Sequence, residues 1–531
     1  MHKKLPLLLI AFLEGFCVIL IELASGRIVA PIFGTGLQVW SGVLGITLFG
    51  LASGYFLGSR LNFIKNSIII YLIGSASIYV AAFTYFSETI LYSFSTLNYE
   101  IGLIFSLFTF LFIPLTLLGA VGPFLSDRLA SLNGKAGKAT GVIFSISTFG
   151  GIGGAFITGF FLIPQFGITK TLYIASFLLS LIVLFIISIQ HSKRKSIKVT
   201  AFSSVLVFIF LQLEISAKKS SSSMNQLVKY EDESMLSQLR VIDVPTQQHN
   251  GDNVTFRMMM VNNTLQAIVD ANNLSVDYLQ FGRLMEPLID NYFTGKRVLI
   301  LGLGGGVIAN QFVNANCKVD VVEIDSRIQK TAIQYFGLSE RVNVIIQDAR
   351  RYIENTDQKY DLVFIDTFHG ESIPSHIFTK EALDKMRLLL TESGVLITNF
   401  HGFTDSERGI ATAAVFKTLK HVGFESKILV TNTNDSEMRS LLFLSNLNDF
   451  DEYPALENLT ISNLTYKSGY EGNLSKFMVD PSVLSVQKAP LLIDDKQQLD
   501  FLLREVSLEW RLYCYEKFVK MNKQLNISIV D

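Results

Sequence analysis

The first 215 residues of this 531-residue chain hold nearly all of its long apolar runs, and these runs limit the fold more than any other feature. Seven apolar segments can be distinguished, at residues 5–25, 39–59, 67–86, 101–122, 139–163, 169–190 and 197–215. Each approaches the roughly 20 residues that a helix needs to cross a hydrocarbon core about 30 Å thick. Because backbone polar groups in lipid must be satisfied within the segment, we expect a multi-pass α-helical membrane domain over residues 1–215, with about seven transmembrane helices.

Glycines recur at every fourth position on two of these segments. Gly50, Gly54 and Gly58 share one helical face, and Gly150 and Gly154 share another. Small residues at this spacing let the backbones of membrane helices approach closely. We therefore expect tight helix–helix contacts at these glycines.

The distribution of lysine and arginine predicts the orientation of this domain. The amino terminus and the loops on its side carry eleven such residues, whereas the intervening loops carry only Arg27 and Lys170. The excess places the amino terminus in the cytoplasm. Seven spans then put the polar remainder outside the cytoplasm, and six would return it to the cytoplasm. The outcome depends on the short segment 197–215, whose basic flanks favour a span and hence an outside location.

Charge and cysteine content exclude several kinds of protein. The net charge of −1 gives no reason to expect a nucleic-acid partner. Cys17, Cys317 and Cys514 are odd in number and far apart, so they predict neither a disulfide framework nor a zinc site.

The stretch 296–325 predicts a ligand-binding βαβ unit. The apolar run 298–301 is typical of a strand buried on both faces, and it leads into the glycine turn Gly302, Gly304, Gly305 and Gly306. A helix-compatible stretch and a second buried strand, 319–324, follow. That strand ends with Glu323 and Asp325. Glycines let a ligand approach the backbone, and an acidic residue at the second strand can accept hydrogen bonds from a ribose diol.

The βα alternation continues beyond this unit. Strands are expected at 342–346, 362–365 and 395–399, with a closing hairpin at 427–431 and 441–444. Asp348 and Asp366 follow the first two of these strands. Because open α/β sheets bind ligands at the carboxyl ends of their strands, we expect the acidic residues to converge on one crevice.

Five divisions of the chain follow from these patterns. The membrane domain is followed by a serine-rich linker, a small antiparallel β-sheet subdomain that ends in a helix at 276–293, an α/β Rossmann-like domain, and a carboxyl-terminal extension. Their expected bounds are 1–215, 216–232, 233–290, 291–445 and 446–531.

The α/β part resembles the spermidine synthase (polyamine aminopropyltransferase) family in VLILGLGGGV, VVEID, IIQDARRYI and YDLVFIDTF, which stand in this order over 298–368. The upstream stretches ESMLSQLRVIDV, FRMMMVNNTLQAIVD and VDYLQFGRLM fit the β-sheet domain and entrance helix of that family, so the resemblance covers about 233–445. The motifs IELASGRIVAPIFGTGLQVWSG and LASGYFLGSRL resemble the bacterial membrane-fused members. This resemblance implies a class I methyltransferase-like Rossmann domain attached to a bacterial inner membrane.

The resemblance also implies roles for individual residues. The cofactor would be S-adenosylmethionine or its decarboxylated form, with no metal. Its binding site would consist of Gly302, Gly304, Gly305, Gly306, Glu323, Asp325, Asp348 and Ala349. Asp366 would be the catalytic base that takes a proton from the attacking amine. Tyr278, Gln280 and His369 would face the acceptor.

Three departures from the family pattern concern the acceptor. The chain has Gly305 where the family's glycine loop usually carries an aspartate, and His369 where a second aspartate grips the diamine. It also has Leu279 and Gln280 where a histidine and a glutamate are common. Because a dicationic diamine requires carboxylates at both ends, these changes argue against plain putrescine as the acceptor.

Several alternatives remain open from the sequence. A metal site from His369, Glu371, His376 and His401 lacks zinc-type spacing, so no metal is expected. The function could be alkyl transfer to a small-molecule, lipid or envelope amine, methyl transfer to a lipid or envelope substrate, or transport or sensing through a nucleoside-binding domain. Asp366 favours an enzyme that acts on an amine. The sequence leaves the oligomeric state open, with a homo-oligomer among the arrangements that it allows.

Overall fold

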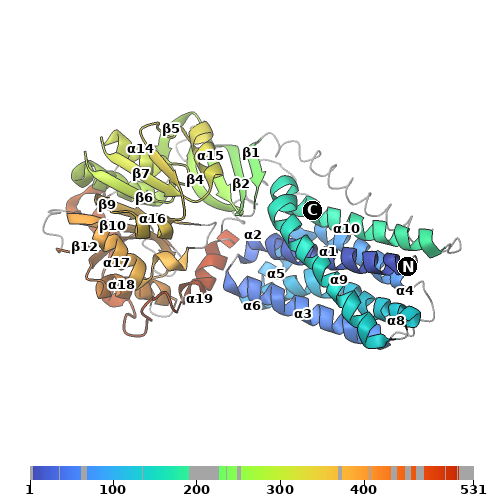
Figure 1. Cartoon of the computed structure of the whole chain (residues 1–531). Coiled ribbons are helices and arrows are strands. Elements are labelled where there is room, and N and C mark those ends of the chain that lie inside the picture. Colours follow the sequence, from blue (N-terminus) through green and yellow to red (C-terminus); the bar gives the residue numbers. More distant parts are fainter. Residues whose placement is uncertain are drawn as a thin grey trace. The chain divides into compact units, whose positions relative to one another are not determined.

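The computed structural model describes residues 4–34, 36–60, 68–133, 135–190, 227–234, 236–247, 253–368, 373–405, 408–431, 439–448, 456–461, 472–496, 498–510 and 512–513. Two compact units are distinguished (Figure 1). One is helical and comes mainly from Met1–Asn225, and the other is an α/β unit that comes mainly from Ser237–Phe518.

Among its described residues, the helical unit contains five helices that are long and apolar enough to cross a membrane: Leu5–Ile28, Gln38–Arg60, Ile68–Tyr85, Tyr99–Leu132 and Ala136–Ile189. The last has 54 residues, and its backbone leaves the helical region at Gly167, with φ 78° and ψ 174°. This bend separates the predicted segments 139–163 and 169–190. These helices mark the chain as an integral membrane protein. The predicted segment 197–215 lies outside the described residues.

Short π-helical turns interrupt two of these long helices. Its elements are α1 (Leu5–Ile28), α2 (Ala30–Phe33), α3 (Leu37–Arg60), α4 (Ile68–Tyr85), α5 (Ser87–Ser95), α6 (Tyr99–Leu107), a π-turn (Phe108–Phe112), α7 (Ile113–Gly119), α8 (Val121–Asn133), α9 (Ala136–Ile157), a π-turn (Thr158–Leu162) and α10 (Ile163–Gln190).

The glycine faces make the close contacts that their spacing predicts. A Cβ added to Gly54 of α3 would lie 2.9 Å from the Cα of Gly119, and one added to Gly154 of α9 would lie 2.6 Å from the carbonyl oxygen of Phe16 in α1. No side chain fits at either distance, so these helices approach backbone to backbone.

The α/β unit is built on an eight-stranded sheet in the order β15-β11-β12-β10-β9-β6-β7-β8. The strands from β10 through β9, β6 and β7 to β8 are parallel, and β12 pairs antiparallel with both β10 and β11, as the predicted closing hairpin requires. Their bounds are β6 (Arg297–Leu301), β7 (Lys318–Glu323), β8 (Asn343–Ile346), β9 (Tyr360–Ile365), β10 (Leu390–Gly402), β11 (Glu425–Val430), β12 (Arg439–Asn446) and β15 (Met478–Val479).

Helices cover both faces of this sheet, with α14 and α15 on one side and α17 and α18 on the other (Figure 1). Alternate residues of β6 serve the two faces: Ile300 packs in one apolar cluster with α14 and α15, and Leu299 packs in the other with α16 to α18. Burial on both faces explains the continuous apolar run of this strand. The helices are α14 (Val307–Asn314), α15 (Ser326–Phe336), α16 (Ala349–Asn355), α17 (Lys380–Leu389) and α18 (Ile410–His421).

A five-stranded antiparallel sheet precedes the α/β sheet in the chain. It consists of β1 (Val228–Glu233), β2 (Gln238–Gln247), β3 (Asn253–Val261), β4 (Thr264–Asp270) and β5 (Asn273–Asp277). β1 begins inside the stretch 216–232 that the sequence predicts to be a linker. The helix expected over 276–293 begins only at Gln280, because Asp277 still pairs with Val269 in the sheet. It comprises α13 (Gln280–Leu288) and a π-turn (Ile289–Phe293).

The described parts of the carboxyl-terminal region belong to the same compact unit. Leu484, Leu499 and Leu503 are buried in the apolar cluster that includes β10 and α18. The short elements of this region and of the preceding loops are η4 (Ser375–Ile377), η5 (Leu456–Asn458), β13 (Thr460–Ile461), β14 (Gly472–Asn473), η6 (Leu474–Phe477), η7 (Pro481–Val483) and α19 (Leu499–Leu502).

Candidate active site

A cavity of about 760 Å³ lies at the carboxyl ends of β6, β7, β9 and β10. β6 and β9 are neighbours in the sheet although β7 and β8 lie between them in the chain. The strand order therefore reverses beside β6, and α/β sheets bind their ligands at such a point. The cavity is large enough for a nucleoside-sized ligand together with a second substrate.

The glycine turn after β6 forms one wall of this cavity. Gly302 has a φ of 97°, and a Cβ at this position would collide with the backbone carbonyl oxygen of Asp366. Gly306, at φ 73°, is the left-handed N-cap of α14. Gly302 and Gly304 line the cavity, Gly305 lines a smaller adjoining one, and Gly306 shapes the turn from outside both.

The Glu323 carboxylate is fixed at the end of β7. Its Oε2 accepts a hydrogen bond from the Leu303 backbone N–H at 3.0 Å, and its Oε1 accepts one from the Asp325 N–H at 2.9 Å. Burial raises the pKa of Glu323, and these two hydrogen bonds partly offset the rise. Each oxygen keeps a second lone pair for a ligand hydroxyl, so the carboxylate can hold a ribose diol.

Asp325 and Asp348 line the same cavity but also have structural roles. Asp325 caps α15 and forms an ion pair with Arg327, with Oδ2 2.6 Å from Nη2. Asp348 caps α16 by accepting from the Arg351 N–H at 2.9 Å, next to Ala349, which also lines the cavity. Asp325 therefore has its charge balanced by Arg327, whereas Oδ2 of Asp348 lies 3.8 Å from Nε2 of His376, which also lines the cavity.

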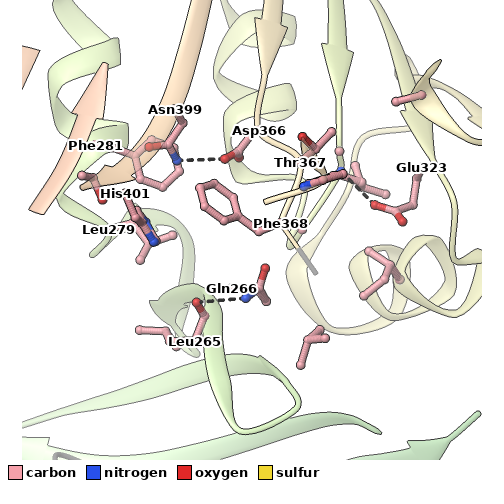
Figure 2. A pocket seen from close by; sticks show the side chains of 18 of the residues that line it. Leu265, Gln266, Leu279, Phe281, Glu323, Asp366, Thr367, Phe368, Asn399 and His401 are labelled. Carbon is pink, nitrogen blue, oxygen red and sulfur yellow. Dashed lines mark hydrogen bonds between the residues drawn. The ribbon is translucent and has the colours of Figure 1, made fainter. Parts of the chain in front are cut away.

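Asp366 follows β9 directly and is held at two points. Its N–H donates to the carbonyl of Leu301 at 2.8 Å, and its Oδ1 accepts from Nδ2 of Asn399 at 2.9 Å (Figure 2). Burial raises the pKa of Asp366 to about 6, and the hydrogen bond from Asn399 opposes this rise. A carboxylate with this pKa is mostly ionised at neutral pH and can accept a proton.

A row of aromatic rings forms the wall beyond Asp366. The ring centroids of Phe368 and His401 are 4.5 Å apart, and those of His401 and Trp510 are 4.9 Å apart. Burial lowers the pKa of His401 to about 4, so this imidazole is neutral at physiological pH. Tyr278 and Gln280 line the cavity as well. His369 lies outside the described residues.

Among the described residues, no three histidine, cysteine, aspartate or glutamate side chains are grouped so that they could hold a metal ion. Two members of the set considered from the sequence, His369 and Glu371, are not among those residues. The other two, His376 and His401, both line the cavity.

Three contributors to the site were not assigned to it from the sequence. Asn399 follows the apolar part of β10, just as Asp366 follows β9. The strand-end pattern that identified Asp366 could therefore have identified Asn399 as well. Asp277, which lines the smaller adjoining cavity, is an isolated acid in an alternating segment. Trp510 comes from the carboxyl-terminal region, where no local pattern connects it with β10.

Comparison with known proteins identifies the class of this domain. The Spermine/spermidine synthase domain family matches residues 287–442. A polyamine aminopropyltransferase of Vibrio vulnificus is 40% identical over 111 residues, which cover 20% of this chain and 37% of the relative. An N-terminal histidine N-methyltransferase of Emericella nidulans is 30% identical over 168 residues, which cover 30% of each protein. The spermidine synthase structure from Thermotoga maritima aligns with a TM-score of 0.34 and 15% identity, covering 48% of this chain and 86% of that one.

The carboxyl-terminal half of the chain thus contains a spermine/spermidine synthase domain of the polyamine aminopropyltransferase family. Before that domain this chain has a helical unit, in whose described part five long apolar helices lie. It spans only about a third of the length of the two curated relatives named above.

Proposed function

We propose that this protein is a membrane-bound transferase that moves an alkyl group from an adenosyl-sulfonium cofactor to an amine. The observation that carries the proposal is the position of Asp366. This carboxylate of raised pKa is oriented by Asn399 and shares one cavity with the glycine turn and Glu323.

The residues present fit such a cofactor. Gly302 and Gly304 line the cavity, a Cβ at Gly304 would meet nothing closer than the Gln266 carbonyl oxygen at 3.6 Å, and Glu323 has lone pairs free for two ribose hydroxyls. Ala349 offers an apolar surface and Asp348 an acceptor oxygen for the adenine. The bound group would supply a carbon made electrophilic by its bond to a positively charged sulfur.

The chemistry that remains for the protein is to orient the amine and remove its proton. Transfer of that carbon to the amine nitrogen would break the carbon–sulfur bond, whose electron pair would remain on sulfur. The nitrogen becomes cationic, and Asp366 stabilises the charge and accepts the proton. The aromatic wall of Phe368, His401 and Trp510 excludes water from the nitrogen and accommodates apolar parts of the acceptor.

This wall supports an acceptor other than plain putrescine. His401 is neutral and the rings beside it are uncharged, so these three rings offer apolar contact and no negative charge. Glu509, which also lines the cavity, is exposed to solvent. We infer an amine with an apolar portion, drawn from small molecules or from lipid or envelope components.

Methyl transfer from S-adenosylmethionine is the second candidate. The relative described above that methylates an N-terminal histidine supports it. Both reactions release a thioadenosine compound, but methyl transfer yields S-adenosylhomocysteine and aminopropyl transfer yields methylthioadenosine.

Product analysis tests both candidates. The full chain in detergent is incubated with either sulfonium and a panel of mono-, di- and lipid amines, and the two thioadenosine products are quantified by mass spectrometry. We expect methylthioadenosine in the presence of a suitable amine, and the Asp366→Asn variant as background. If neither product exceeds that background with any amine, the proposed transfer is refuted.

We also propose that the amino terminus is cytoplasmic and that the transferase domain lies outside, because loop charges and seven spans support this arrangement. A pair of reporters fused after Asp531 tests it. Active alkaline phosphatase with a dark fluorescent protein supports an outside location, and the reverse result would mean that 197–215 does not span.

A further inference from the structure

Two glutamates are buried inside the helical unit, both on the apolar helix α1. Glu14 is 5% exposed and Glu22 is 8% exposed. Among the described residues, no lysine or arginine forms an ion pair with either carboxylate. Ionisable side chains inside a membrane domain are costly, face its interior and mark places where ions or substrates bind. The transfer chemistry described above uses neither glutamate, so each requires another explanation.

Glu22 lies at a seam between α1 and α3. One turn after it, a Cβ on Gly26 would lie 3.2 Å from the ring of Trp40 and 3.3 Å from Val43, both on α3. Residues four apart share one face of a helix, and Glu22, one turn earlier on α1, faces Thr47, one turn later on α3. The two helices are therefore antiparallel here, and the close packing at Gly26 holds the Glu22 carboxylate at the seam.

Two hydroxyl groups beside Glu22 lack a hydrogen-bond partner. Thr47 is 4% exposed, and its buried Oγ1 makes no hydrogen bond of normal geometry although it faces the carboxylate. Ser25 is fully buried, and its Oγ has no partner either. Ser25 follows Glu22 by three residues on α1, so the two share one side of the helix. Because buried polar atoms without partners are rare, the carboxylate and the two hydroxyls form a polar site that a ligand would complete.

Glu14 has a different environment on the same helix. Its Oε2 accepts a hydrogen bond from Oγ of Ser147 in α9 at 3.0 Å. A Cβ on Gly15 would collide with the backbone of Ser147, so α1 and α9 touch here with no room for a ligand. Glu14 therefore has a donor within the protein and a structural role in this helix contact. Glu22 is the carboxylate that a ligand can reach.

The groups at Glu22 suit an ammonium better than a metal ion. Among the described residues, no three histidine, cysteine, aspartate or glutamate side chains are grouped so that they could hold a metal. Ca²⁺ takes roughly six to eight oxygen ligands. An alkylammonium has three N–H donors, which match one carboxylate oxygen and the hydroxyl oxygens of Thr47 and Ser25. The negative charge of Glu22 balances the cation, and charge-assisted hydrogen bonds of this kind are strong.

We propose that the helical unit binds the ammonium group of a protonated alkylamine at Glu22, with Thr47 and Ser25 as further acceptors. This site lies in the helical unit alone, so the inference goes beyond the proposed transfer reaction and does not depend on it. Glu22 precedes the end of α1 at Ile28 by six residues, or about 9 Å along the helix. The ammonium therefore enters from the nearby end of α1, and the alkyl chain stays among the apolar side chains of the seam.

Equilibrium binding of radiolabelled n-butylammonium to the full chain in detergent tests the proposal. The wild type should show a saturable component that Glu22→Gln weakens about tenfold or more, the change expected when a hydrogen-bonded charge is lost. Glu14→Gln is the matched control, because it removes the same charge from the same helix and keeps an acceptor for Ser147. Its affinity should stay within about twofold of the wild type. Asp366→Asn should leave this component unchanged.

The variants separate this site from the acceptor site of the proposed function. Equal weakening by Glu22→Gln and Glu14→Gln would assign both glutamates a structural role only, and unchanged binding in Glu22→Gln would also refute the proposal. Loss of the component in Asp366→Asn would place the amine in the α/β unit, which overturns this inference and supports the proposed function. A chain that transfers no alkyl group but loses butylammonium binding with Glu22→Gln supports this site and refutes only the reaction.

A measurement on the wild type covers the case of a variant that fails to fold. Dicyclohexylcarbodiimide modifies carboxyl groups in apolar surroundings, and peptide mass spectrometry reports the modification of Glu22. n-Butylammonium at ten times its dissociation constant should slow this modification about tenfold. Tetramethylammonium, which has no N–H, and sodium should protect much less.

Equal protection of Glu22 by all three cations would show a general effect of charge and contradict an ammonium site. A rate that no cation changes would leave only a proton as the ligand, and this result also overturns the proposal. A Glu22 that does not react at all is closed to a ligand of this size, with the same consequence.

Discussion

Replacing Asp366 by asparagine should abolish transfer and at the same time stabilise the protein. The variant keeps the shape of the side chain, and its Oδ1 can still accept from Nδ2 of Asn399, which lies 2.9 Å away in the wild type. It loses the proton acceptor. General base catalysis typically contributes about 10²–10⁴-fold, so turnover should fall by at least about a hundredfold while the affinity for the cofactor changes little.

The gain in stability follows from the pKa of this carboxyl. The folded state raises that pKa from 3.8 to about 6, so the folded state holds the proton more tightly than the unfolded state does. The free energy of unfolding therefore falls as the pH rises from about 4 to about 6 and stays lowered above that. Each pH unit corresponds to about 1.4 kcal/mol, so the penalty at neutral pH is roughly 3 kcal/mol. Asparagine does not ionise and does not incur it.

Two assays on the full chain measure these effects. Single-turnover formation of the thioadenosine product gives the rate, and thermal unfolding at pH 4 and pH 7 gives the stability difference. Asp290→Asn, an exposed aspartate in the π-turn after α13, serves as the matched control and should alter neither. If the Asp366 variant keeps more than about a tenth of the wild-type rate, Asp366 is not the base. If it is no more stable at pH 7, burial does not penalise the carboxylate as described.

Three further substitutions test other parts of the site. Glu323→Ala should weaken cofactor binding by about 1–3 kcal/mol, because ribose hydroxyls lose their acceptor, and calorimetry that finds no loss would contradict this role. His401→Phe should give a flatter pH–stability curve between pH 6.5 and about 4. In the wild type the lowered pKa of His401 means that only the unfolded state gains the proton in this range, so the free energy of unfolding falls as the pH falls. Parallel curves for the two proteins would refute this role of His401. Gly305→Ala should destabilise by about 1–3 kcal/mol through overpacking against Ala267, and Ala267→Gly in the same chain should restore part of the loss in denaturant unfolding.

Periodicity and strand ends made it predictable that Gly302, Glu323 and Asp366 line one cavity. Each of these residues stands directly after a buried apolar run, and parallel strands bring such positions to one edge of the sheet. The acceptor side depends on long-range packing. Trp510 contacts His401 although more than a hundred residues separate them, and no periodicity reports such a contact. Asp277 shows a different limit of the sequence analysis. Pairing with β4 extends β5 as far as Asp277, which lies in the stretch 276–293 that was predicted to be a helix.

The tight junction between the Gly302 backbone and the carbonyl of Asp366 divides the proposed reaction centre into parts that evolution can alter separately. The glycine turn, which we propose receives the cofactor, and the loop that carries Asp366 touch without an intervening side chain, so one cannot shift without the other. The wall beyond them combines Phe368, on the same loop as Asp366, with His401 of β10 and Trp510 of the carboxyl-terminal segment. Substitutions at Trp510, which comes from neither of the two joined loops, are therefore expected to reshape the proposed acceptor pocket and to leave Gly302 and Asp366 in place. The scaffold is in this sense modular, and directed evolution toward new amines should begin with the residues of that wall.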